Sequence, residues 1–272
     1  MAPATIAGVT TPRIWSGAAD LPVVAGRRPR PEIVALPAET LPSVAELFTF
    51  MRDAELRFGT LRMRIEERSF GVVGELLTVV DVALRHPDEA RVTTTTPALG
   101  TTTNHEVWIS DGHSVRTYSA AHRLGTDRPV RRAVVGVSGP DSRGLPASSR
   151  VYAPFTALPP ETLPDTFVHP AGYCQNVLST GTCRIVGLGE VGERETIVLE
   201  CDHPRTIEMN ADRPDFRIRI AVDRADGVIL RLEESIGGAV TRDAKVTTYE
   251  PDAALPPTIF DFTFPSGTTM LF

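Results

Sequence analysis

Glu234 is a candidate acid or base. It lies in a segment where apolar and polar residues alternate as in a β-strand. Val228, Leu230 and Leu232 fall on one side of residues 228–236, and Glu234 is the next residue on that apolar side. If this side faces the protein interior, loss of water around the carboxylate disfavours its charged form and raises its pKa, which suits acid–base catalysis. The alternative is that a bulge or the strand end turns Glu234 into solvent.

The histidines do not indicate a metal centre. His105 and Glu106 are neighbours, so on a strand they point to opposite faces and cannot share one ion. His113 falls in a predicted turn. His169 and His203 each precede a proline, and we expect both in loops.

Short motifs do not indicate a cofactor either. The motifs G-x-S-x-G and H-E-x-x-H and the P-loop do not occur. Gly187, Gly189 and Gly192 have the spacing of a dinucleotide-binding loop. The strand–helix context of such a loop is missing, because a second strand and not a helix is predicted after them, so we interpret them as a hairpin turn. No residue is marked as a nucleophile, although a Ser/His/Asp triad stays open. We therefore expect no metal and no cofactor.

The three cysteines are Cys174, Cys183 and Cys201. They contain no C-x-x-C pair, which argues against a zinc site. In an exported protein Cys174 and Cys183 could close a small loop, whereas in the cytoplasm we expect free thiols.

Length and charge bound the class of protein. The chain has 272 residues, 42% of them hydrophobic, which suits one large β domain or two small ones. The net charge is -6 and no basic stripe is present, so we expect no nucleic-acid binding. We expect no membrane span, because no apolar run reaches roughly 18 residues. Residues 1–30 lack the basic start and apolar stretch of an export signal, so we predict a cytoplasmic location unless a leader was removed.

Residues 43–58 are predicted to form an amphipathic helix. Ser43 and Glu46 have the spacing of a capping box, in which each side chain bonds the backbone N–H of the other. Gly59 is placed to end the helix. The apolar residues fall on one face at helical spacing: Val44, Leu47, Phe48, Met51 and Phe58.

The clearest strands lie in residues 216–236, where apolar and polar residues alternate. Asp226 and Gly227 supply a turn within this stretch, and Gly237 with Gly238 supplies the next. The same signals predict further strands over 61–66, 75–85, 91–96, 101–109, from 115 onward, 182–187, 195–201, 206–210 and 244–248. The result is a series of antiparallel meanders.

Two proline-rich stretches divide the chain. The apolar residues in 1–42 have neither helical nor strand spacing, and we predict an extended arm that docks in part on the body of the protein. Residues 121–170 are predicted to be a long irregular insertion with room for one short helix, of the kind that often forms a lid. The remainder of 43–272 is predicted to be a single β domain.

Several stretches between residues 43 and 264 together carry a family resemblance. The C-terminal stretches that carry the resemblance are Arg217-Ile-Arg-Ile-Ala-Val-Asp-Arg, then Asp226-Gly, then Leu230-Arg-Leu-Glu-Glu, and finally Leu255-Pro-Pro-Thr-Ile-Phe-Asp-Phe. The earlier ones are His86-Pro-Asp with Arg91-Val, and Trp108-Ile-Ser-Asp-Gly112 followed by Tyr118. These stretches resemble the LolA/RseB-like superfamily. The arm, the insertion and the missing export signal depart from the family pattern.

This resemblance implies a mainly β fold: an open antiparallel β-barrel of about eleven strands with a helix packed in its mouth. The concave face of such a barrel would hold an acyl chain or a similar hydrophobic small molecule. We predict that the ligand contacts Phe48, Met51, Met63, Trp108, Tyr118 and Tyr173. For the aromatic residues among these, packing in the core is the alternative.

Three functions suit such a cavity. The protein could carry or sense a lipid or lipoprotein, as the resemblance implies. It could be a cofactor-free cyclase or isomerase of an apolar natural-product intermediate, with Glu234 as its acid or base, because holding a flexible substrate in shape removes much of the entropic barrier. It could also be an RseB-like regulator that binds a protein partner through the sheet edge. The absence of a visible export signal favours the enzyme among the three.

Overall fold

The structure is a computed structural model that describes residues 35–37, 40–72, 74–97, 103–130, 154–204 and 213–271. Most of the predicted arm at 1–42, the predicted strand at 206–210 and the 131–153 part of the predicted insertion lie outside the described residues. The following description concerns the described residues alone.

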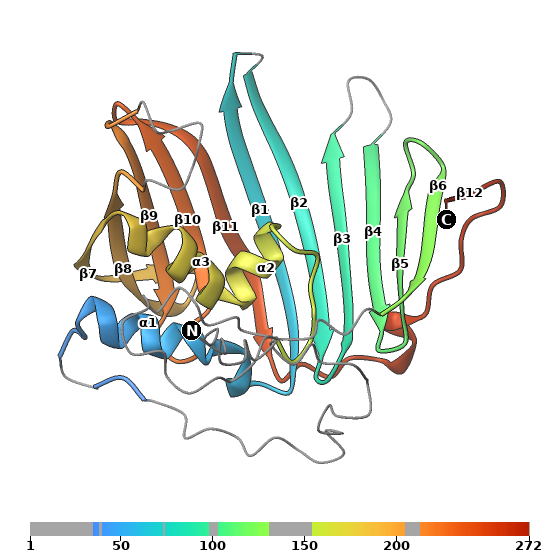
Figure 1. The fold of residues 1–272 in the computed structure, drawn as a ribbon, viewed down its shortest axis with the longest axis horizontal. Helices are drawn as coiled ribbons and strands as arrows, with labels where there is room; N and C mark the ends of the chain where they lie inside the picture. Colours follow the sequence, from blue (N-terminus) through green and yellow to red (C-terminus); the bar gives the residue numbers. More distant parts are fainter. Residues whose placement is uncertain are drawn as a thin grey trace, which may run out of the picture. The chain divides into compact units, whose positions relative to one another are not determined.

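Twelve strands in this part of the chain form one sheet (Figure 1), in the order β12-β6-β5-β4-β3-β2-β1-β11-β10-β9-β8-β7. Their bounds are β1 Thr60–Gly71, β2 Gly74–Arg85, β3 Glu89–Pro97, β4 Thr103–Asp111, β5 Ser114–Ser119, β6 Leu124–Pro129, β7 Thr182–Val191, β8 Arg194–Asp202, β9 Phe216–Asp223, β10 Ile229–Ile236, β11 Ala239–Pro251 and β12 Thr269–Leu271. The strands β1 to β6 form one meander and β7 to β11 another. The two meanders join where β1 pairs with β11.

The predicted fold class is confirmed: the structure is mainly β, and its sheet is open. Eleven strands were expected and twelve are present in the described residues. All neighbouring strands are antiparallel except β12 and β6, which run parallel. The strands also extend beyond the predicted bounds, because pairing with a neighbour continues where the sequence alternation fades.

The predicted capping box is present at the start of α1 (Val44–Arg52). The Ser43 hydroxyl accepts a hydrogen bond from the Glu46 backbone N–H at 3.2 Å, and the Glu46 carboxylate accepts one from the Ser43 N–H at 2.7 Å. The helix is shorter than the predicted 43–58, because Asp53 ends it and a 3-10 turn, η2 (Ala54–Arg57), replaces its last turn.

The predicted insertion at 121–170 is more regular than expected. Residues 124–129 form β6, which has no apolar alternation and is held by its pairing with β5. A Cβ on Gly125 in this strand would lie 2.7 Å from the Phe264 ring, so only glycine lets the C-terminal segment pack so closely. The helical elements after it are α2 (Leu163–Val168), α3 (Pro170–Asn176), η4 (Leu178–Thr180) and, near the C-terminus, η6 (Pro257–Phe260).

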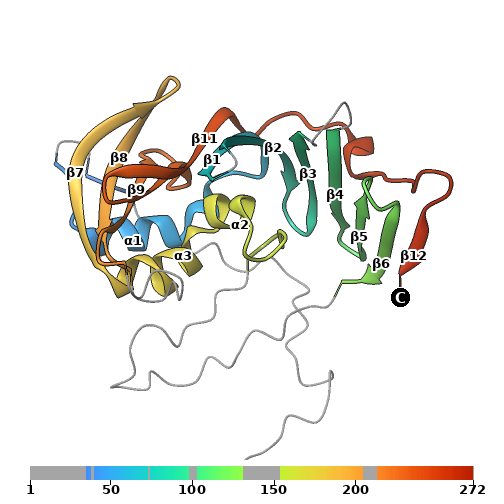
Figure 2. The same ribbon diagram turned by 90° about the horizontal axis from the view of Figure 1, so that it is seen from above.

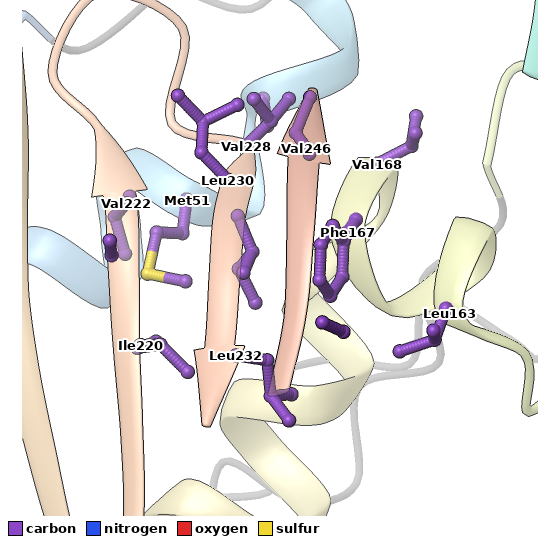
Figure 3. Packing of buried hydrophobic residues seen from close by; sticks show 14 of the residues in the cluster. Met51, Leu163, Phe167, Val168, Ile220, Val222, Val228, Leu230, Leu232 and Val246 are labelled. Atoms are coloured by element: carbon purple, nitrogen blue, oxygen red, sulfur yellow. The ribbon is translucent and has the colours of Figure 1, made fainter. Parts of the chain in front are cut away.

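The helices α1, α2 and α3 lie on one face of the sheet, which curves around them (Figure 2). One apolar core forms between α1, α2 and α3 and the strands on this face. Figure 3 shows Met51 of α1 beside Ile220 and Val222 of β9, with Phe167 of α2 near Val246 of β11. The predicted helix α1 therefore packs directly on the strands β9 to β11, and buried side chains occupy the space between them.

Candidate ligand-binding site

A groove of about 590 Å³ crosses the strands β2 to β6 on the helix-bearing face of the sheet. The segment 159–164, which leads into α2, forms its roof. The hydroxyl of Thr162, the residue before α2, donates a hydrogen bond to the Pro159 carbonyl at 2.6 Å and so closes a turn in this roof. The roof residues are Pro159, Glu161, Thr162, Leu163 and Pro164.

Strand register builds the floor of the groove from two neighbouring rows of side chains. Residues directly opposite in an antiparallel pair point to the same face, so each row runs across the strands. The first row is Val80, Thr94, Glu106, Ser119 and Leu124, from β2 to β6. The second row is Val92, Trp108, Thr117, Thr126 and Leu271, from β3 to β6 and on to β12.

The floor is apolar with interspersed hydroxyl groups. The hydroxyls of Thr117 and Thr126 bond each other at 2.7 Å, so this pair needs no partner from a ligand. The Ser119 hydroxyl is buried and has no hydrogen-bond partner among the described residues. The floor can therefore lie against a hydrocarbon chain and still offer one hydroxyl to a polar group.

One end of the groove is closed by an ion-pair cluster. Arg242 of β11 lies 2.5 Å from Glu67 of β1 and 3.5 Å from Glu234 of β10. Burial raises the pKa of Glu234, and Arg242 opposes part of that rise. The predicted direction of the Glu234 pKa shift is therefore present, but the carboxylate is occupied by Arg242 and is not part of the groove wall.

The charged groups in the wall are three carboxylates and one guanidinium. Glu67 and Arg242 neutralise each other, whereas Glu106 and Glu161 have no ion pair or hydrogen bond within the described residues. Three negative charges and one positive charge give the wall a formal charge of -2. Glu106 comes from the floor and Glu161 from the roof, so the negative charge is present on both sides of the groove.

A second cavity of about 560 Å³ lies beside η2, α2 and α3. His169 lies in its wall, with Nδ1 at 2.9 Å from Asp165 and Nε2 at 3.3 Å from Glu55. Burial alone would lower the pKa of His169, but the contacts with Asp165 and Glu55 outweigh burial and raise it to about 9. The Glu55 carboxylate also accepts a hydrogen bond from the Phe155 N–H at 2.8 Å. This cluster ties the roof segment to the turn after α1.

The predicted ligand contacts fall in different places. Trp108 lies in the groove floor, and Tyr118 borders the groove while its ring packs against Phe262 at 6.1 Å. Met51 and Met63 are fully buried in the core, because the apolar face of α1 packs directly on the sheet and leaves no space there. The remaining two are Phe48, which packs against the core, and Tyr173 of α3, whose buried hydroxyl lacks a hydrogen-bond partner in the described part of the chain.

The roof residues and the floor carboxylate Glu106 were not predicted as site residues. One signal for the roof was available: the proline-rich insertion was expected to act as a lid. The floor could not be found from periodicity, because threonines in a strand are typical of any half-buried sheet. Its rows depend on the register of six strands, β2 to β6 and β12.

The described sheet has two edge strands, β12 and β7. Among the described strands, β7 pairs only with β8. It exposes Val186 and Leu188. A partner protein at this edge stays a prediction.

Among the described residues no helix has both the length and the apolar character to cross a membrane. Nor does any group of three or more His, Cys, Asp or Glu side chains there have an arrangement that could hold a metal ion.

No protein-family model matches this chain, and no curated protein matches it in sequence. Among solved structures, MucB is similar at 15% identity and a TM-score of 0.45, over 80% of this chain and 62% of the MucB chain. A LolA superfamily protein from Nitrosomonas europaea is similar at 11% identity and a TM-score of 0.30, over 82% of this chain and 99% of that one. Solved structures that are similar to this chain at low identity thus include MucB and a LolA superfamily protein.

A third similar structure is the MucA/MucB complex from Pseudomonas aeruginosa, at 15% identity and a TM-score of 0.42. The match covers 80% of this chain and 60% of the other. The chain thus spans less than two thirds of the MucB chains that it resembles.

Proposed function

We propose that this protein binds an elongated apolar molecule, such as a lipid acyl chain, in the groove between β2–β6 and the 159–164 segment, and acts as its carrier or sensor. The groove itself carries this proposal. Its volume of about 590 Å³ is within the range of small-molecule sites. Leu124, Trp108 and Val92 provide apolar surface along its floor.

The shape of the floor supports a long, narrow ligand. Each row of the floor crosses five strands, and neighbouring strands are about 4.8 Å apart, so a row is roughly 19 Å long. The roof covers one side of this track. A stretched hydrocarbon chain would fill the track better than a compact ring system.

The charge of the wall supports a cationic or uncharged head group over an anionic one. Glu106 and Glu161 would attract an ammonium group and repel a sulfate or carboxylate. Trp108 lies in the same floor, and its ring face can stabilise a cation.

A cyclase or isomerase finds no support in the described residues. Glu234, the candidate acid or base, is engaged by Arg242 and is not in the groove wall. A carrier or sensor requires only a groove that fits the ligand. We therefore favour the non-catalytic role.

Quenching of Trp108 tests the proposal. The chain has two tryptophans, Trp15 and Trp108, so the Trp15→Phe variant leaves Trp108 as the single tryptophan. Acyl chains brominated along their length should quench its emission saturably. Absence of saturable quenching at concentrations below micelle formation would rule out binding in this groove.

Head-group preference is measured with detergents of one chain length that carry a trimethylammonium, a maltoside or a sulfate head. We expect the trimethylammonium form to bind most tightly and the sulfate form most weakly. The double variant Glu106→Gln, Glu161→Gln should reduce this difference. Equal affinity for the three heads would refute the charge argument and leave the chain-binding proposal standing.

A further inference from the structure

Two cysteines face each other across the edge of the sheet. Cys183 of β7 and Cys201 of β8 are directly opposite in the antiparallel register. Directly opposite residues point to the same face, with their Cα atoms about 4.5–5.5 Å apart. A disulfide requires Cα atoms about 4.4–6.8 Å apart, so this pairing satisfies the distance without movement of the backbone.

The side chains of the pair converge on one backbone oxygen. The thiol of Cys183 lies 3.1 Å from the Leu178 carbonyl oxygen, and the thiol of Cys201 lies 3.4 Å from the same atom. Both sulfur atoms therefore lie on the same side of their strands, next to η4. The third cysteine, Cys174, is turned elsewhere: its sulfur is 3.7 Å from the Met51 sulfur in the core.

We propose that Cys183 and Cys201 are a disulfide-forming pair, open to oxidation by a peroxide. The three cysteines are free thiols in the structure. Peroxide would oxidise one thiol of the pair to a sulfenic acid and release water. The second sulfur would then attack the first, form the S–S bond and release a second water molecule. The loop-closing pair considered from the sequence, Cys174 with Cys183, is not the one that the register brings together.

The difference in exposure between the two thiols sets the order of the reaction. Cys183 is partly exposed, whereas Cys201 is buried beneath the turn at Gly181. That turn is tight: a Cβ on Gly181 would lie 2.8 Å from the Cys201 sulfur and 2.5 Å from the Asp202 carbonyl oxygen. An oxidant therefore reaches Cys183 first, and the Cys201 sulfur is placed to displace water from it.

The bridge would change the contacts of η4. Both thiols lie within hydrogen-bond distance of the Leu178 carbonyl, and a disulfide sulfur has no hydrogen to donate to it. The bridge would also fasten the free edge strand β7 to β8. Oxidation should thus strengthen the sheet edge and loosen the link between α3 and β7.

Peptide mapping of the full chain tests the proposal. The protein is treated with hydrogen peroxide, alkylated under denaturing conditions without reductant, digested and analysed by mass spectrometry. We expect one cross-link, between the peptides that contain Cys183 and Cys201, with Cys174 alkylated. The Cys174→Ser variant should give the same cross-link, and the Cys183→Ser and Cys201→Ser variants should give none.

Reduction with dithiothreitol should reverse the bridge. The oxidised protein should melt roughly 5–10 °C higher than the reduced one, because the bridge closes a loop in the unfolded chain. Three alkylated cysteines after peroxide treatment, or a bridge that includes Cys174, would overturn the proposal. The mapping is done on the unaltered chain, so it does not depend on whether the variants fold.

Discussion

The Nε2 atom of His169 lies 3.3 Å from the Glu55 carboxylate, and this contact joins the start of α3 to the turn after α1. On its other side the imidazole contacts Asp165 at 2.9 Å. The segment that roofs the groove leads into the helix that carries Asp165. His169 therefore holds the roof element against the body of the protein.

Stability should fall with rising pH through the titration of His169. Its pKa is raised to about 9 in the folded protein, from an ordinary value of 6.5. The proton is bound more tightly in the folded state, so the stabilisation is fully present below pH 6.5 and is lost as the pH rises through about 9. The effect is on the order of 3 kcal/mol.

Melting temperatures between pH 6 and pH 10 check this prediction. The His169→Gln variant is the control, because it removes the titrating group and leaves the other ionisable residues in place. The unaltered protein should lose stability relative to this variant across that interval. Parallel curves for the two proteins would contradict the assignment.

Asp223 should contribute far more to stability than an exposed carboxylate of the same geometry. It is buried, it accepts hydrogen bonds from the backbone N–H groups of Ala225 and Asp226 at 2.9 and 2.8 Å, and it pairs with Arg194 through both oxygens. Asp223→Ala should cost about 3–5 kcal/mol, because two N–H groups lose their acceptor and Arg194 loses one of its two carboxylate partners and keeps only Asp226.

Asp81→Ala is the matched control for Asp223→Ala. Asp81 also binds an arginine through both oxygens, with Arg64 at 2.8 and 3.0 Å, but the pair is exposed. Exposed pairs contribute about 0–1 kcal/mol, so the control should unfold in urea almost as the unaltered protein does. Equal losses for the two variants would disprove the role given to burial.

Met51→Asp should destabilise the fold strongly without acting through the groove. Met51 is fully buried between α1 and the sheet (Figure 3), and a carboxylate there would lack a partner. The expected cost is several kcal/mol. Ala45→Asp on the exposed side of the same helix is the control, and urea unfolding is the measurement. Unchanged stability of Met51→Asp would mean that α1 does not pack as described.

A bulky residue in the floor should close the groove. Thr94 lies in the first floor row, whereas Thr95 is its neighbour on the opposite face of β3. Thr94→Trp should reduce the affinity for an acyl chain at least tenfold, and Thr95→Trp should leave it unchanged. Affinity is measured by competition with a fluorescent fatty acid, after circular dichroism has verified both folds. Equal affinity of the two variants would show that the ligand binds elsewhere.

The sequence by itself determined the features that depend on neighbours a few residues away. The capping box at Ser43 and Glu46 is local, and so is the turn at Asp226 and Gly227 between β9 and β10. The alternation in 216–223 required only the period of a strand, and the structure has β9 there. These local signals, with the family resemblance, were enough to predict an open, mainly antiparallel sheet.

Only the tertiary structure decided which distant residues meet. The sequence marked β6 as irregular, yet pairing with β5 makes it a strand and completes the groove floor. It placed Met51 against a ligand, whereas α1 packs on the sheet and leaves the space under the 159–164 segment instead. The pairing of Cys183 with Cys201 likewise follows from register. Register depends on the turns and bulges that join the strands and on the hydrogen bonds between them, and the alternation within one strand does not encode it.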